Sequence, residues 1–197
     1  MTPAADPALR PVLRRVALLN LGYFGIEAAV ALTIGSVALV ADSFDFLEDA
    51  SLNILILIAL DWTTPRRARV GMGLAVILLV PTLGPLGMLW IKINAPAPPA
   101  ALPLPLAGLG ALAVNVSCAA MLARLCSAGG SLLRAAFLSS RNDAPANVAI
   151  NAAGGVTALT RSGIADIVVG IGIAVINITA AREVFALARA EHRSAPA

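Results

Sequence analysis

The chain has 197 residues, of which 59% are hydrophobic and only 13% charged, and its mean hydropathy is +0.88. This composition lies far from that of ordinary soluble domains and predicts a protein whose solvent is the lipid bilayer. If each spanning helix takes about 20 residues, the length allows about six spans and leaves no room for a separate soluble domain. We therefore expect an all-α fold, a polytopic membrane protein built as a six-transmembrane-helix bundle.

Six apolar runs are long enough to be spans, at residues 16–34, 37–60, 70–91, 104–125, 135–159 and 164–187. The segments between them are polar or rich in Gly and Pro, which is typical of turns, at residues 35–36, 61–69, 94–105, 127–131 and 160–163. This predicts an N-terminal cytoplasmic segment (1–15), a transmembrane domain (16–187) and a short cytoplasmic tail (188–197). Asn20 and Glu27 interrupt the first run, so we interpret it as a span rather than a signal peptide.

Most basic residues fall before spans one, three and five or after spans two, four and six: Arg10, Arg14, Arg15, Arg66, Arg67, Arg69, Arg124, Arg134, Arg182, Arg189 and Arg193. Only Lys92 and Arg161 fall at the opposite ends of the spans. The positive-inside rule then places both termini in the cytoplasm. The net charge of +3 is explained by this topology, and we expect no nucleic-acid partner.

The second span carries four acidic residues within eight positions, Asp42, Asp45, Glu48 and Asp49. An acid near the bilayer centre costs about 2.5 to 3.5 kcal/mol on insertion scales, so such residues are functional candidates. Asp45 and Asp49 lie four positions apart on one helix face, where two like charges repel unless a cation or a proton lies between them. In the fifth span, Asp143 and Asn147 have the same spacing.

If these two helices face each other, Asp45, Asp49, Asp143 and Asn147 form a set of oxygen ligands suited to a divalent metal ion. A carboxylate must lose its proton to bind metal, so protons compete with the ion for the same groups. The residues therefore predict a secondary transporter that exchanges metal for protons. We expect no organic cofactor, and the metal ion is the transported substrate.

The remaining acids have both structural and functional interpretations. A structural interpretation of Asp42 is a local hydrogen bond near the start of its helix. A structural interpretation of Glu48 is that it faces a loop or a partner subunit. Asp166 is interpreted as the N-terminal acid of span six, favoured by the helix dipole. Glu27 must face the bundle interior, where it joins a proton path or pairs with an arginine. All four stay candidates for supporting or proton-path roles.

Other polar or helix-breaking residues inside the spans have ordinary structural explanations. Interhelical hydrogen bonds are expected of Asn20, Asn53, Asn115, Asn151 and Asn177. Cys118 and Cys126 are interpreted as packing residues. The helix-breaking residues have two interpretations: they are hinges, or they reflect the ordinary occurrence of Gly and Pro in spanning helices. These residues are Pro81, Gly84, Pro85, Gly87, Pro145, Gly154 and Gly155.

Two segments resemble the cation diffusion facilitator family. Residues 35–49, Gly-Ser-Val-Ala-Leu-Val-Ala-Asp-Ser-Phe-Asp-Phe-Leu-Glu-Asp, are similar to its second-helix signature of a small-residue turn, an Ala-Asp-Ser segment and two ligands four positions apart. Residues 140–147, Ser-Arg-Asn-Asp-Ala-Pro-Ala-Asn, resemble its fifth-helix ligand segment. Residues 166–170 resemble the start of its sixth helix. The resemblance extends from about Asn20 to Ala188 and is weakest in spans three and four.

The resemblance implies a six-helix transporter, usually a homodimer, that exports zinc or a related divalent ion (Co, Cd, Fe or Mn) from the cytoplasm in exchange for protons. Asp45, Asp49, Asp143 and Asn147 would be its ligands. The chain departs from the common pattern because its single histidine, His192, lies in the tail and because Asn147 replaces the usual acid. Many members also carry a cytoplasmic domain after span six, so a short form is expected here. The lack of a cleavable targeting segment favours a bacterial inner membrane.

Two alternatives compete with transport. An intramembrane aspartyl hydrolase would use Asp45 and Asp143 as a dyad, but would leave Asp49 and Asn147 without a role. A serine hydrolase lacks its general base, because no histidine lies in any span. We therefore expect that the chain is not an enzyme. A transport-silent membrane partner of the same fold remains the alternative, favoured by the short tail and by Asn147.

Overall fold

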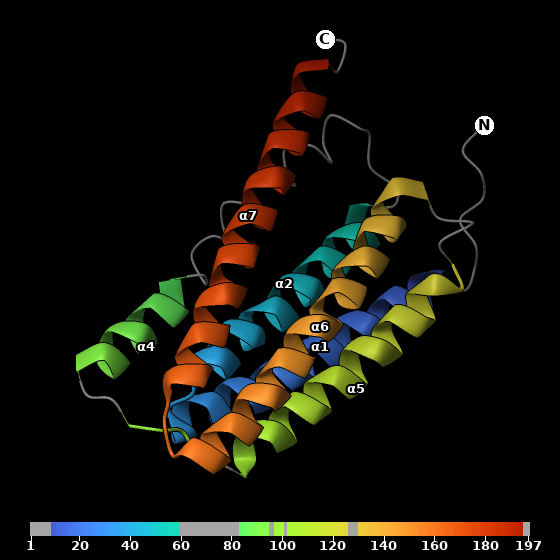
Figure 1. Cartoon of the computed structure of the whole chain (residues 1–197). Helices are drawn as coiled ribbons and strands as arrows, with labels where there is room; N and C mark the ends of the chain where they lie inside the picture. The colour runs from blue at the N-terminus through green and yellow to red at the C-terminus, as the bar shows by residue number, and fades with distance from the viewer. Residues whose placement is uncertain (1–8, 60–82, 95–96, 101, 126–129, 195–197) are drawn as a thin grey trace.

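The computed structural model describes residues 9–59, 83–94, 97–100, 102–125 and 130–194 (Figure 1). Six helices occupy these residues, α1 (Leu9–Ile34), α2 (Val37–Ala59), α4 (Leu83–Asn94), α5 (Pro103–Ala123), α6 (Gly130–Thr160) and α7 (Ile164–Ser194). This part of the chain contains no strand. The predicted all-α fold is confirmed.

The predicted turns mark helix ends, but α1 begins at Leu9 rather than residue 16, α6 begins at Gly130 rather than 135, and α7 continues to Ser194 rather than 187. The predicted turn at residues 35–36 separates α1 from α2, and Gly35 adopts a φ of +67°, a conformation that favours glycine. The predicted turn at 160–163 ends α6, but there the left-handed residue is Arg161, with a φ of +52°. Most of the third predicted span lies outside the described residues, as do Pro81 and the 61–69 loop. Pro145 does not interrupt α6.

Successive helices alternate in direction. In Figure 1 the start of α1, the end of α2, the end of α5, the start of α6 and the end of α7 lie toward one end of the bundle. The turns at residues 35–36 and 161–163 lie toward the other. Helix α2 occupies the centre, because it packs against α1, α6 and α7.

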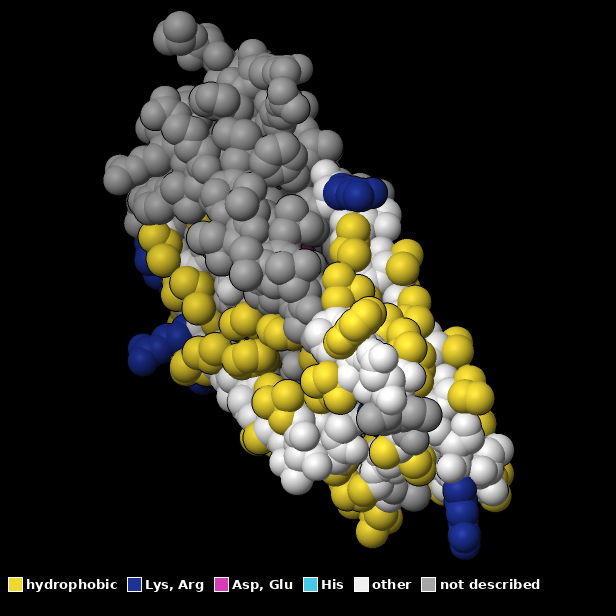
Figure 2. Space-filling model, turned by 90° about the vertical axis from the view of Figure 1, so that its left-hand side faces the viewer, with side chains coloured by type: hydrophobic (Ala, Val, Ile, Leu, Met, Phe, Trp, Pro, Cys, Tyr) yellow, Lys and Arg dark blue, Asp and Glu magenta, His cyan; other side chains and the backbone are white. Residues whose placement is uncertain are grey.

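Many large apolar side chains lie exposed on the described surface, and several acidic and amide side chains are buried, which is unusual for a soluble protein. Large apolar side chains such as Leu32, Trp90 and Leu159 are exposed, and Figure 2 shows hydrophobic side chains spread over the described part of one face. Among the described helices, α1 and α5 are long and apolar enough to cross a membrane. Helix α2 has the length, but every 18-residue window of it contains its four acids. The same acids that mark the candidate site lower its hydropathy.

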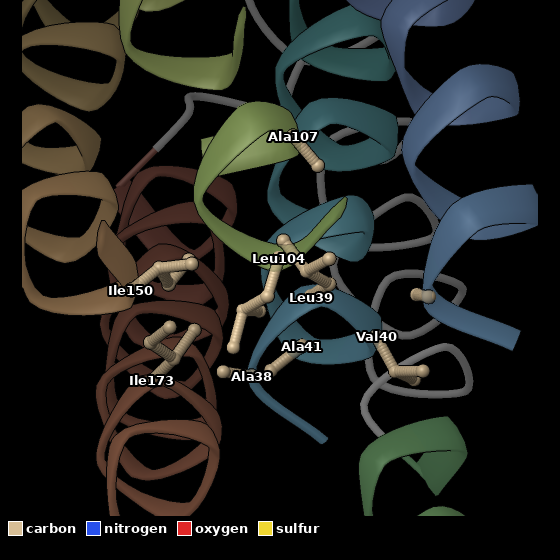
Figure 3. Packing of buried hydrophobic residues seen from close by; sticks show 9 residues of the cluster. Ala38, Leu39, Val40, Ala41, Leu104, Ala107, Ile150 and Ile173 are labelled. Atoms are coloured by element: carbon tan, nitrogen blue, oxygen red, sulfur yellow. The ribbon is translucent and has the colours of Figure 1, made fainter. Parts of the chain in front are cut away.

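Two clusters of buried apolar residues lie at different levels of the bundle. The first cluster contains Leu9, Leu13, Val16, Ile56, Cys118, Leu122, Leu125 and Ala136. The second cluster contains Ala31, Ala38, Leu39, Val40, Ala41, Leu104, Ala107, Ile150 and Ile173, and Figure 3 shows its members from α2, α5, α6 and α7 meeting. The expected packing role of Cys118 is confirmed. The acids of α2 fall between the levels of the two clusters.

Gly170 allows α7 to approach the start of α2. A Cβ atom at Gly170 would lie 2.7 Å from Val37 Cγ1 and 2.8 Å from the backbone nitrogen of Ala38. Backbone atoms cannot move aside as a flexible side chain does, and overpacking typically costs about 1 to 3 kcal/mol. We expect Gly170→Ala to lower the melting temperature of the detergent-purified protein by several degrees. Gly172→Ala is the matched control, because nothing lies within 4 Å of its Cβ position. Equal melting temperatures for the two variants would contradict close packing at Gly170.

Candidate metal centre

The inward face of α2 is lined by polar residues at helical spacing. Asp42, Asp49 and Asn53 follow one another at intervals of seven and four residues, which places them on one stripe, and all three are buried. Asp45, between them, is also buried, whereas Glu48 is partly exposed. The three aspartates of α2 therefore lie in the interior of the bundle.

Helix α6 meets this stripe with side chains at matching intervals. Asn147 donates from Nδ2 to both carboxylate oxygens of Asp42, at 2.8 and 2.7 Å. Ser140, two turns earlier on α6, donates from Oγ to Asp49 Oδ2 at 2.6 Å. Asp143 lies between them in sequence, and its charge would interact with those of Asp45, Asp49 and Asp42. The second and fifth predicted spans therefore face each other, as expected.

The side chains that meet are not the pairs that the sequence suggested. Asn147 donates to Asp42, and its Oδ1 accepts a hydrogen bond from Asn115 Nδ2 at 3.1 Å. Within the described residues, no three Asp, Glu, His or Cys side chains converge closely enough to hold a metal ion. The four predicted ligands thus surround one region without closing on a common point, and their ligand roles stay predictions.

Glu27 faces the same region from α1. Its side chain is fully buried, which confirms that it points into the bundle, and its strongest charge interaction is with Asp42. Among the described residues, the group that Glu27 interacts with most strongly is thus another carboxylate, that of Asp42. Pairing with an arginine, one of the two predicted roles, is therefore not observed there.

The prediction that Asp166 is the N-terminal acid of its span is confirmed, and Asp166 has a second role as well. It lies in the first turn of α7, but its carboxylate bonds to the start of α2 instead of serving only its own helix. It accepts hydrogen bonds from the Ser36 hydroxyl, from the Val37 backbone N–H at 2.9 Å and from the Ala38 backbone N–H at 3.2 Å. These are orphan donors of the first turn of α2, so Asp166 acts as a helix cap supplied by a distant part of the chain.

The buried asparagines divide into three kinds. Asn115 makes the interhelical bond that the sequence predicted. Asn53 and Asn151 instead donate to backbone carbonyls four residues earlier in their own helices, each at 2.8 Å, and Asn20 makes no hydrogen bond. The Asn177 side chain lies outside the described residues. Sequence reasoning also missed Ser140, although its position three residues before Asp143 puts both on neighbouring faces of one helix.

Replacing Asn147 by aspartate tests the contact with Asp42. Two carboxylates at that distance repel each other when both are ionised, so they either share a proton or hold a cation between them. We expect Asn147→Asp to lower the melting temperature of the metal-free protein and to enlarge the rise in melting temperature on adding Zn²⁺ or Mn²⁺. Asn151→Asp, one turn further along α6, is the control. Equal metal responses in both variants would contradict a metal site beside Asp42.

A family model described as the cation efflux transmembrane domain matches residues 13–189, nearly the whole span from α1 to α7. No curated protein matches the chain. The match covers both helices that carry the candidate ligands and all six described helices in whole or in part. The chain therefore belongs to the cation efflux family, the cation diffusion facilitators, and is an integral membrane protein whose transmembrane domain serves metal-cation transport.

Proposed function

We propose that this protein exports divalent metal ions from the cytoplasm in exchange for protons, through a site between α2 and α6. One observation supports this most: Asp45 and Asp49 of α2 and Asp143 of α6 lie within electrostatic range of one another inside an apolar bundle. Repulsion among three such carboxylates disfavours their joint ionisation without a bound cation. The aspartyl-dyad alternative is disfavoured because the family consists of transporters.

The hydrogen bonds indicate how the site would close around an ion. Asp49 is held by Ser140 through Oδ2, whereas its Oδ1 is buried and has no hydrogen-bond partner among the described residues. Asp49 therefore needs no rearrangement to offer one oxygen. Asn147 would offer its Oδ1 only after Asn115 releases it. We infer that the three carboxylates bind first and that Asn147 contributes in a second step.

Proton exchange follows from the chemistry of the ligands. Each carboxylate releases its proton to bind metal, and each takes a proton again when the metal leaves. The first and second clusters lie on either side of the acids along α2, so opening one while closing the other would give access to alternate sides of the membrane. By the positive-inside rule, the first cluster faces the cytoplasm.

The ligand set bears on metal choice. Oxygen ligands accept zinc, cobalt, cadmium, iron or manganese, and the absence of histidine from the predicted ligand set favours harder ions more than a histidine site would. Zinc remains the leading candidate because of the family resemblance, and a homodimer in a bacterial inner membrane is the proposed setting.

Uptake into proteoliposomes tests the proposal. Purified protein is reconstituted with an acidic interior, so that outward proton flow drives inward flow of Zn²⁺, Co²⁺, Cd²⁺ or Mn²⁺, and uptake is compared with and without an ionophore that collapses the pH gradient. Uptake that requires the gradient supports exchange. Uptake that is indifferent to the gradient would overturn it. No uptake by folded protein would favour the transport-silent partner, which the engagement of Asn147 by Asp42 and Asn115 also suggests.

A further inference from the structure

Asn20 of α1 is fully buried, and neither of its side-chain amide atoms has a hydrogen-bond partner among the described residues. The other fully buried asparagines of the described chain, Asn53, Asn115 and Asn147, each make at least one. A buried amide without a partner is destabilising, so natural proteins rarely contain one without a reason. Asn20 therefore calls for a binding partner that the described residues do not supply.

The register of α1 against α2 places Asn20 beside Asp49. The two helices are antiparallel, and the rings of Tyr23 and Phe46 lie 4.9 Å apart between centroids. Asn20 lies three residues before Tyr23 on α1, and Asp49 lies three residues after Phe46 on α2. In an antiparallel pair these two positions are at the same level. The same register puts Glu27 level with Asp42, and these two charges interact most strongly with each other.

Among the described residues, three buried oxygen acceptors without hydrogen-bond partners lie within one helical turn of this level: Asn20 Oδ1, Asp49 Oδ1 and Asn53 Oδ1. Side chains of a helix lean toward its N-terminus. Because α1 and α2 run in opposite directions, Asn20 leans toward the level of Asn53, and Asn53 leans toward the level of Asp49. One carboxylate and two amide oxygens form a ligand set of the kind that holds a partly hydrated divalent cation.

We propose that Asn20 and Asn53, together with Asp49 Oδ1, form a subsite for the divalent cation. The subsite lies beside the carboxylates of the proposed site, on the side nearest the first cluster. This inference rests on the proposed transport function and extends its site from α2 and α6 to α1. It also supplies the amide ligand that the sequence assigned to Asn147, whose amide is already engaged by Asp42 and Asn115. The amide oxygens that receive the ion come from α1 and α2.

Asn20→Leu separates this role from a structural one. Leucine has a similar size and removes two unpartnered polar atoms from an apolar interior, so the melting temperature of the metal-free protein should stay the same or rise. The affinity for Zn²⁺ and Mn²⁺, measured by titration calorimetry on the full chain in detergent, should fall by about tenfold or more. Asn20→Asp, which replaces the amide by a carboxylate, should raise the affinity.

Thr157→Val is the matched control, because Thr157 Oγ1 on α6 is also buried without a partner and lies outside the subsite. This variant should keep the native metal affinity. Native affinity in both Asn20→Leu and Asn20→Asp would overturn the subsite. Asp45→Asn distinguishes the two levels of inference. If Asp45→Asn loses metal binding while the Asn20 variants bind normally, only the subsite fails. The proposed function fails if the native protein binds no more metal than empty micelles do, or if Asp45→Asn binds metal as the native protein does.

Discussion

Asp143→Asn is expected to abolish gradient-driven metal uptake while leaving the helices folded. The substitution preserves the size of the side chain and removes the one carboxylate that α6 contributes to the group containing Asp45 and Asp49. An ion between α2 and α6 would then lose charge compensation from one side. We expect the uptake rate to fall by about a hundredfold. Uptake of ⁶⁵Zn²⁺ into proteoliposomes measures the effect.

The melting temperature separates this result from misfolding. Removing one of several mutually repelling carboxylates relieves repulsion in the metal-free protein, so Asp143→Asn should not melt at a lower temperature than the native chain. Thr160→Ala, at the exposed end of the same helix, should transport normally. Native uptake by folded Asp143→Asn would exclude α6 from the site and leave a site on α2 and α1.

The turns and the apolar runs were predictable because they depend on local chemistry. Gly35 marks a backbone conformation that few other residues adopt, and it ends α1 where the sequence indicated. The inward direction of Asp45 and Asp49 was predictable for a similar reason, because spacing along one helix fixes which face a residue occupies. Arg161, in contrast, takes a left-handed conformation that no feature of the sequence signals.

The partners of the site residues were not predictable, because they depend on the register between helices. A spacing of four residues says that Asp143 and Asn147 share a face of α6, but not whether that face meets Asp45 or Asp42. The structure shows that Asn147 meets Asp42 and that Ser140 meets Asp49. Asn53 and Asn151 satisfy themselves within their own helices, an option that is open to any asparagine in a helix and that its sequence context does not reveal.

Asp166→Ala is expected to cause the largest loss of stability among single substitutions of the buried acids. One carboxylate satisfies the Ser36 hydroxyl and the backbone N–H groups of Val37 and Ala38, and its negative charge faces the positive end of α2. Its removal would leave three buried donors without an acceptor. At about 1 to 3 kcal/mol for each unsatisfied group, with partial relief from water, we expect a net loss of roughly 3 kcal/mol. Thermal unfolding of the purified protein measures it.

Ser36→Ala calibrates this expectation, because it removes only the hydroxyl that bonds to Asp166 and to the backbone of Leu39. Its effect should be about 1 kcal/mol. Asp166 differs from the α2 acids in having three donors of its own and Lys92 within electrostatic reach. Loss of Asp166 should therefore lower the stability of the protein directly. It should change metal affinity only indirectly, by shifting the position of α2. A normal melting temperature for Asp166→Ala would mean that close packing at Gly170 alone holds α7 against α2.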